Sequence, residues 1–109
     1  MKVEVLHIDD CSNWQEAGSR TRQALDALGL IDIPVEFVPI GTEMDAARTG
    51  FAGSPTITVD GEDLFPSGGR TTDLACRVYL TDHGLAGMPT LAQLGRALRE
   101  RAELEGGLL

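Results

Sequence analysis

The chain has 109 residues, 42% of them hydrophobic, with 17 acidic against 9 basic side chains and a formal net charge of −8. A surface this acidic repels phosphate backbones, so we expect no nucleic-acid binding. The absence of an apolar run of about 18 residues excludes a membrane-spanning helix, and an N-terminus without the apolar core of a secretory signal predicts a cytoplasmic protein.

The first third of the chain predicts a strand, a helix and a second strand. Residues 3–8 are rich in β-branched residues and mostly apolar on both faces, which is typical of a central parallel strand. Candidate N-caps follow at residues 9–13, and apolar side chains then recur at helical spacing from Trp14 to Leu28. The second strand is predicted at residues 35–40. A strand, a helix and a second strand in this order predict parallel strands joined by a right-handed crossover.

The remainder predicts a short helix, a hairpin and a final helix. The short helix should cover residues 43–49, with Met44 and Ala47 facing inward. Residues 56–65 predict a hairpin, because the Asp-Gly pair at 60–61 suits the positive φ angles of a type I′ turn. The final helix should follow Thr90, with Gln93 completing a capping box. Its expected buried stripe consists of Leu91, Leu94, Leu98 and Ala102, and Gly106-Gly107 should end it.

Residues 66–88 show no clear period and are predicted as a loop or insert, with one short strand or helical turn at 74–80. The elements together predict one α/β domain over residues 1–109, built on a central mixed sheet.

The first cysteine, Cys11, follows the first predicted strand at the start of the first predicted helix. Free backbone N–H groups and the helix dipole stabilise a thiolate at such a position. The neighbouring carboxylates of Asp9 and Asp10 oppose that charge by a similar amount. The sequence therefore leaves open whether Cys11 is activated, and His7 or Arg77 would decide it if either folded nearby.

The second cysteine, Cys76, lies 76 − 11 = 65 positions downstream. It is interpreted as a resolving thiol for Cys11, as the second ligand of a two-coordinate soft-metal site, or as a buried free thiol. In a reducing compartment both cysteines should be thiols, not a structural disulfide, and the apolar neighbours of Cys76 slightly favour the free thiol. His7 is expected to be a hydrogen-bonded core residue and His83 a turn residue. No pattern predicts a cofactor.

One stretch carries a resemblance to a known family. Residues 47–61, with Gly53-Ser54-Pro55-Thr56 leading into an apolar strand, resemble the cis-proline segment of thioredoxin-like proteins. Together with Cys11 and the later Cys76-Arg77-Val78-Tyr79, the chain looks like a group of short bacterial thioredoxin-like proteins, some of which are labelled alkylmercury lyase. The resemblance spans nearly the whole chain except residues 66–88.

The resemblance implies roles for matched positions. Cys11 would be the nucleophile, Pro55 the cis-proline beside it, and the backbone at Ser54 would pair with an extended substrate. The chain departs from the family at Trp14, which stands where Cys-x-x-Cys has its second thiol. Core packing is the first expectation for this side chain, and its place beside Cys11 makes it a candidate substrate contact.

Three functions follow as hypotheses. The leading one is a thiol-dependent oxidoreductase with Cys11 as nucleophile, Cys76 as resolving thiol, and a thiol or disulfide protein or a small thiol as partner. The second is a non-catalytic thioredoxin-fold module that binds a protein partner. The third is soft-metal or organomercurial chemistry at Cys11 and Cys76.

Overall fold

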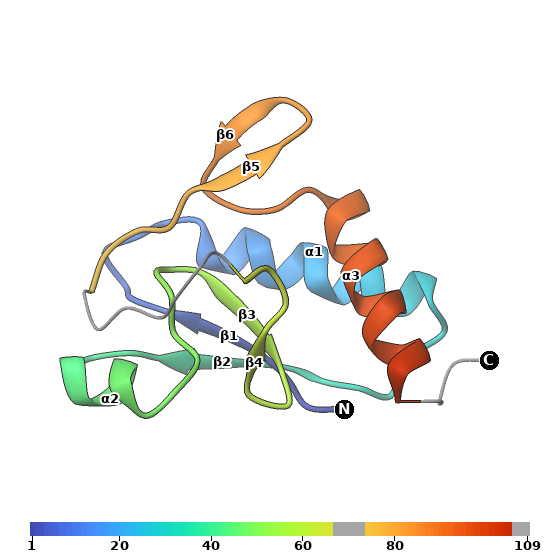
Figure 1. Cartoon of the computed structure of the whole chain (residues 1–109), viewed down its shortest axis with the longest axis horizontal. Helices are drawn as coiled ribbons and strands as arrows, with labels where there is room; N and C mark the ends of the chain where they lie inside the picture. The colour runs from blue at the N-terminus through green and yellow to red at the C-terminus, as the bar shows by residue number, and fades with distance from the viewer. Residues whose placement is uncertain (67–73, 106–109) are drawn as a thin grey trace.

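The computed structural model describes residues 1–66 and 74–105. Within these residues a four-stranded mixed sheet, a separate two-stranded ribbon and three helices form an α/β architecture (Figure 1). In chain order the elements are β1 (Val3–His7), α1 (Trp14–Ala27), β2 (Val35–Pro39), α2 (Glu43–Ala47), β3 (Thr56–Val59), β4 (Glu62–Asp63), β5 (Tyr79–Thr81), β6 (Gly84–Ala86) and α3 (Leu91–Leu104).

The sheet confirms the predicted mixture of parallel and antiparallel strands. Its order is β2-β1-β3-β4, with β1 parallel to β2 and antiparallel to β3. The turn between β3 and β4 has φ angles of 52° at Asp60 and 84° at Gly61, as the predicted hairpin requires. The carboxyl end of β1 therefore lies next to the start of β3, which brings the Cys11 and Pro55 segments to the same edge.

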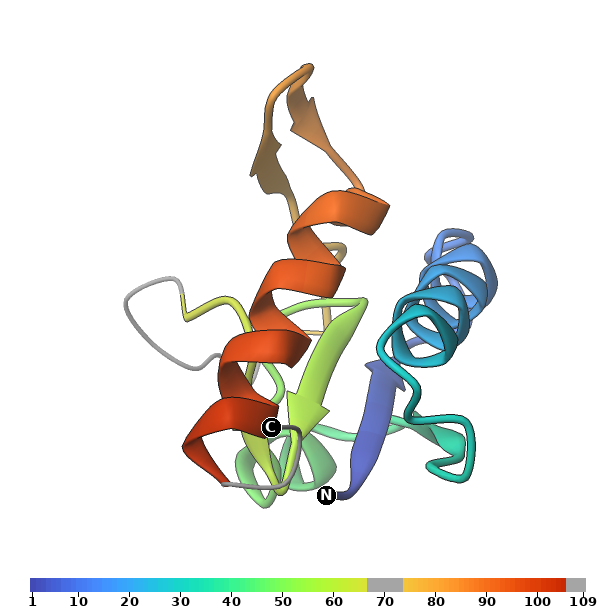
Figure 2. The same cartoon turned by 90° about the vertical axis from the view of Figure 1, so that its right-hand side faces the viewer.

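Two helices cover one face of the sheet. Leu25 of α1 and Leu98 of α3 are fully buried, and they pack with Val5 of β1 and Ile57 of β3 in one apolar cluster. Figure 2 shows α1 and α3 side by side over these strands. Burying an aliphatic side chain of this size contributes roughly 1.5–3 kcal/mol, so this cluster fixes the position of α1 and of the loop that precedes it.

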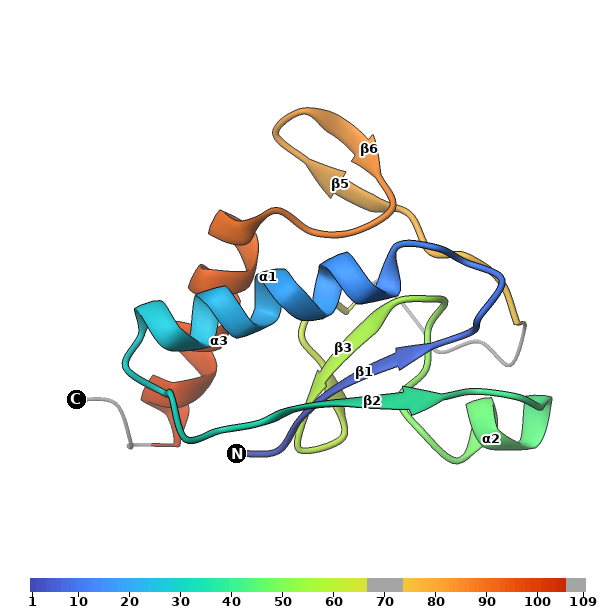
Figure 3. The ribbon, with the colours of Figure 1, turned by 180° about the vertical axis from the view of Figure 1, so that it is seen from behind.

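A second, smaller cluster covers the opposite face. It contains Leu6, Ile8, Cys11, Ile40, Ala46 and Phe51. Figure 3 shows the short helix α2 beyond the end of β2, where it contributes Ala46 to this cluster. The prediction that Met44 and Ala47 face inward is wrong, since Met44 is 61% exposed and Ala47 is also exposed. A helix of five residues is too short for its buried face to be read from a period.

The final helix begins as predicted. Thr90 Oγ1 accepts from the Gln93 N–H at 3.1 Å, and the Thr90 N–H donates to Gln93 Oε1 at 2.9 Å, which completes the capping box. Three residues of the predicted stripe are buried, but Leu91 is 46% exposed. The predicted stop at residues 106–107 lies outside the described residues. None of the described helices is long and apolar enough to cross a bilayer.

The segment that had no clear period contains the ribbon β5–β6. The two strands pair antiparallel, with Leu80 opposite Leu85, and the ribbon projects away from the sheet (Figures 1 and 2). His83 lies exposed in the turn between the two strands, as predicted.

Candidate functional site

Cys11 and Cys76 form a disulfide across 65 positions of sequence, with Cα atoms 5.8 Å apart. This spacing is in the usual range for a disulfide. The expectation that both cysteines are thiols is wrong in this structure, and so is the interpretation of Cys76 as a free buried thiol. The first rested on the expected reducing compartment and the second on the apolar neighbours of Cys76, and neither indicates which distant segments meet.

Cys11 lies in the loop between β1 and α1. Its N–H donates to the carbonyl of Ile8 at 3.3 Å, and its side chain is 4% exposed among Leu6 and Phe51. Helix α1 begins only at Trp14, with Asn13 as an N-cap that makes no side-chain hydrogen bond. Cys11 therefore lies two residues before the N-cap, inside the range 9–13 in which the cap is predicted. In the oxidised state, protein atoms cover it.

Cys76 is held beside the start of β3 by backbone pairing. The Ser54 N–H donates to the Ala75 carbonyl at 2.8 Å, and the Arg77 N–H donates to the Ser54 carbonyl at 2.8 Å, which makes a parallel bridge between Ser54 and Cys76. The Ser54–Pro55 peptide bond is cis, as the resemblance implies. The backbone groups of Ser54 that the resemblance assigns to a substrate are thus bonded to the chain's own segment.

The Ser54 side chain ties this edge to β1. Its Oγ accepts from the Ile8 N–H at 3.0 Å, inside the fold. The carbonyl of the same Ile8 accepts from the Cys11 N–H. Ser54 is therefore hydrogen-bonded both to the strand end that precedes Cys11 and to the segment that contains Cys76. The sequence did not indicate this structural role.

Arg77 holds the Cys76 segment against the sheet. Its side chain is buried, pairs with the Asp63 carboxylate at 2.8 Å and donates to the Phe65 carbonyl. The guanidinium also lies 4.4 Å from the ring centroid of Tyr79. Gly53, with φ of 108°, allows this approach, because a Cβ there would lie 2.8 Å from the Cβ of Arg77.

Tyr79 also holds the segment. It is buried, and its hydroxyl donates to the carbonyl of Pro55. Burial raises the pKa of Tyr79, so the hydroxyl keeps its proton and remains a donor. With Arg77 and Tyr79 both fixed, the position of Cys76 beside Cys11 depends on more than the disulfide.

His7 and Trp14 form an aromatic stack near the first cysteine. Their ring centroids lie 3.9 Å apart, and the Phe37 ring meets Trp14 edge-on at 5.4 Å. Trp14 is partly buried against the main apolar cluster, which agrees with a packing role. His7 is buried as expected, but its Nδ1 makes no hydrogen bond in the part of the chain described, and the nearest charge is Asp9 Oδ1 at 3.4 Å.

Acidification should destabilise the fold through His7. Burial lowers the pKa of His7, while the Asp9 carboxylate acts in the opposite direction. Between that lowered value and the ordinary value of 6.5, the unfolded chain binds more protons than the native one, so the free energy of unfolding falls as the pH drops below 6.5. We expect His7→Phe, which keeps a ring on Trp14, to reduce this pH dependence between pH 7 and 5 in urea titrations.

The exposed His83 provides a matched control for the His7 prediction. His83→Gln should keep the wild-type slope of unfolding free energy against pH. An unchanged slope in His7→Phe would contradict the assignment.

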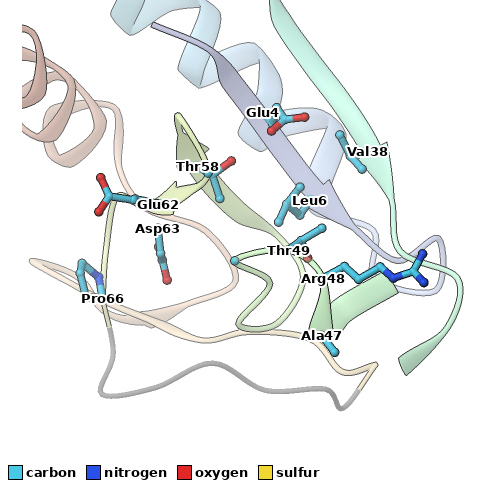
Figure 4. Close-up of a pocket in the computed structure, with 12 residues that line it drawn as sticks. Glu4, Leu6, Val38, Ala47, Arg48, Thr49, Thr58, Glu62, Asp63 and Pro66 are labelled. Carbon is cyan, nitrogen blue, oxygen red and sulfur yellow. The ribbon is translucent and has the colours of Figure 1, made fainter. Parts of the chain in front are cut away.

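Two cavities lie near these elements. One of about 260 Å³ is lined by His7, Asp9, Asp10 and Leu74 among others, so it reaches residues that precede each cysteine in the chain. Figure 4 shows another, of about 620 Å³, which is lined by residues of β1, β3 and β4 and contains neither cysteine. Neither cysteine lines the first cavity, but its lining includes the two carboxylates of Asp9 and Asp10.

In comparisons with known proteins, no family model, no curated protein and no solved structure matches the chain. Across residues 1–66 and 74–105, no group of three or more His, Cys, Asp or Glu side chains is placed to hold a metal ion. Soft-metal chemistry at Cys11 and Cys76 stays a prediction that would require reduction of the disulfide first. Among the described residues, the bonded pair of sulfurs is therefore the best candidate for chemistry.

Proposed function

We propose that this chain is a thioredoxin-like thiol–disulfide oxidoreductase whose redox pair is Cys11 and Cys76. The observation that carries the proposal is the disulfide between them, next to the cis bond before Pro55. In the family that the chain resembles, the partner of the first cysteine is three residues away. Here that position is Trp14, and a cysteine from a distant segment supplies the second sulfur.

The arrangement of elements supports the thioredoxin-like part of the proposal. A parallel β1–α1–β2 unit is followed by the cis-proline at the start of an antiparallel β3, a hairpin and a final helix. These are the features on which the sequence resemblance rests. The ribbon β5–β6 is an addition that the resemblance does not cover.

The chemistry is a two-electron exchange. In the reduced protein, one thiolate attacks an external disulfide RSSR, forms a mixed disulfide and releases one RS⁻. The other cysteine thiolate then attacks the protein sulfur of that mixed disulfide and releases the second RS⁻. The protein ends with the Cys11–Cys76 bond and the substrate as two thiols, and an external dithiol restores the protein by the reverse steps.

The second step is favoured by preorganisation. Contacts of Arg77 with Asp63 and of Tyr79 with Pro55 fix the Cys76 segment independently of the disulfide. After reduction the two sulfurs should therefore stay close, and an intramolecular attack is much faster than attack by a free thiol. This distinguishes the pair from two cysteines that meet by chance in a mobile loop.

Turnover of a model disulfide tests the proposal. With dithiothreitol as the reductant and hydroxyethyl disulfide as the substrate, the wild-type protein should accelerate reduction above the uncatalysed rate. Cys11→Ser and Cys76→Ser should each reduce that acceleration at least about tenfold, because each removes one sulfur of the exchange.

The variant Ser19→Ala serves as a control, since Ser19 is exposed on α1. It should keep the wild-type rate, and circular dichroism should show all variants folded. If the wild-type protein gave no acceleration, or if both cysteine variants kept it, the domain would instead be a binding module.

A further inference from the structure

On the basis of that proposed function, we propose that Cys76, not Cys11, exchanges with the external substrate, and that the substrate is a small, positively charged thiol or disulfide. This reverses the sequence-based expectation in which Cys11 attacks and Cys76 resolves. Three features of the site support it: the exposure of the two cysteines, the pairing of Ser54, and the charges around the disulfide.

Access differs between the two cysteines. Cys76 is exposed, whereas Cys11 is 4% exposed and packs with Leu6, Ile8 and Phe51. A thiolate attacks a disulfide sulfur from the side opposite the sulfur that leaves. Attack on Cys11 would have to come through the apolar cluster, but attack on Cys76 comes from solvent. Access is one of the factors that select which sulfur exchanges.

The backbone groups of Ser54 are not free to pair with a polypeptide substrate. The Ser54 N–H and carbonyl are both bonded to the Cys76 segment, and this segment is held by buried contacts of Arg77 and Tyr79. An extended substrate would have to break these contacts before it could pair with Ser54. A small molecule only needs to reach the exposed Cys76.

The charges around the disulfide favour a cation. Asp9 and Asp10 are exposed, precede Cys11 in the chain, and line the cavity of about 260 Å³ together with Leu74. The nearest basic residue in sequence, Arg77, is buried and paired with Asp63. Within residues 1–66 and 74–105 neither carboxylate forms an ion pair with a lysine or arginine, so the two favour an ammonium group and repel an anionic thiol such as glutathione.

With cysteamine as the thiol, reduction of the protein disulfide takes two steps. The cysteamine thiolate bonds to Cys76 Sγ, the Cys11–Cys76 bond breaks, and Cys11 leaves as a thiolate. A second cysteamine thiolate then attacks the cysteamine sulfur of the mixed disulfide, releases Cys76 and forms cystamine. The protein gains two electrons and two cysteamine molecules lose them.

Trapping the mixed disulfide tests which sulfur exchanges. Oxidised wild-type protein is mixed with less than one equivalent of cysteamine, quenched in acid, alkylated and mapped by peptide mass spectrometry. We expect cysteamine on Cys76 and the alkyl group on Cys11, with at least about a tenfold excess over the opposite pattern. In the reduced Cys11→Ser variant, cystamine should give a stable adduct on Cys76.

The outcomes separate the two proposals. Cysteamine mainly on Cys11 would overturn this inference and leave the proposed oxidoreductase function intact. No exchange with any thiol would overturn both. A disulfide-bonded polypeptide that reacted faster than cystamine would overturn the assignment of a small substrate.

Substrate charge is tested with three disulfides. At low salt the rate of oxidation of the reduced protein should fall from cystamine to neutral hydroxyethyl disulfide to oxidised glutathione, and the preference should shrink as salt is added. Asp9→Asn/Asp10→Asn should reduce the cystamine preference over the neutral disulfide by on the order of tenfold. Asp82→Asn, in the exposed turn of the ribbon, should leave the preference unchanged, and equal rates for all three disulfides in the wild type would contradict the charge argument.

Discussion

Asp63→Asn is expected to lower the free energy of unfolding by about 3 kcal/mol, because it leaves the buried guanidinium of Arg77 without its counter-charge. The side chains of Arg77 and Asp63 are only 5% and 14% exposed, so water cannot replace the lost partner. The substitution keeps the shape of the side chain and its acceptor for the Phe65 N–H. Urea titration of the oxidised proteins measures the change.

The adjacent residue gives a matched control. Glu62→Gln makes the same chemical change one position earlier in β4, but Glu62 pairs with Arg101 while its own side chain is 76% exposed. The loss there should stay below about 1 kcal/mol. Similar costs for the two variants would contradict the assignment of the Arg77–Asp63 pair as a buried support of the Cys76 segment.

The same Asp63 variant should make the disulfide easier to reduce. If the Arg77 contact holds Cys76 close to Cys11, loosening it lowers the effective concentration of one thiol at the other. At a fixed ratio of reduced to oxidised dithiothreitol, a larger fraction of Asp63→Asn than of Glu62→Gln should therefore be reduced. Alkylation followed by mass spectrometry measures that fraction.

Reduction of the disulfide in the wild-type protein is the second large effect. The bond closes a loop of 65 positions, and constraining a loop of this length removes unfolded-state entropy worth about 4 kcal/mol. We expect urea titrations of the oxidised and reduced proteins to differ by roughly that free energy. The measurement is direct because one sample provides both states.

The double variant Cys11→Ser/Cys76→Ser is the control for reduction. Its stability should match that of the reduced wild type and should not respond to dithiothreitol. Superimposable unfolding curves for oxidised and reduced wild-type protein would contradict a closed loop between these two cysteines.

Sequence patterns predicted those elements whose apolar stripes, caps or turn residues match the way they pack in the structure. Helix α1 has one apolar stripe over four turns, and α3 has both a capping box at Thr90 and a buried stripe. The Asp60-Gly61 pair predicted the hairpin because both residues tolerate the positive φ angles that its turn requires. Each of these signals lies within a few residues of the structure that it predicts.

The structure of residues 76–81 could not be predicted because polar and aliphatic side chains there exchange their usual places, inside and outside the fold. Arg77 and Tyr79 face inward, while the aliphatic Val78 and Leu80 are 60% and 76% exposed. The inward side chains are stabilised by partners far away in sequence, Asp63 for the arginine and the Pro55 carbonyl for the tyrosine. A polar residue is tolerated inside only when such a partner exists, and sequence does not reveal it.

The sequence by itself determined the α/β elements, the cis-proline segment through its resemblance, and the two sulfurs on which any chemistry would rest. Only the tertiary structure decided that Cys11 is covered, that Cys76 is exposed, and that the two are bonded with Ser54 between their segments. The physical reason is the range of the interactions. Caps, turns and helical stripes act over a few residues, but burial and pairing across 65 positions depend on how the sheet brings its edges together.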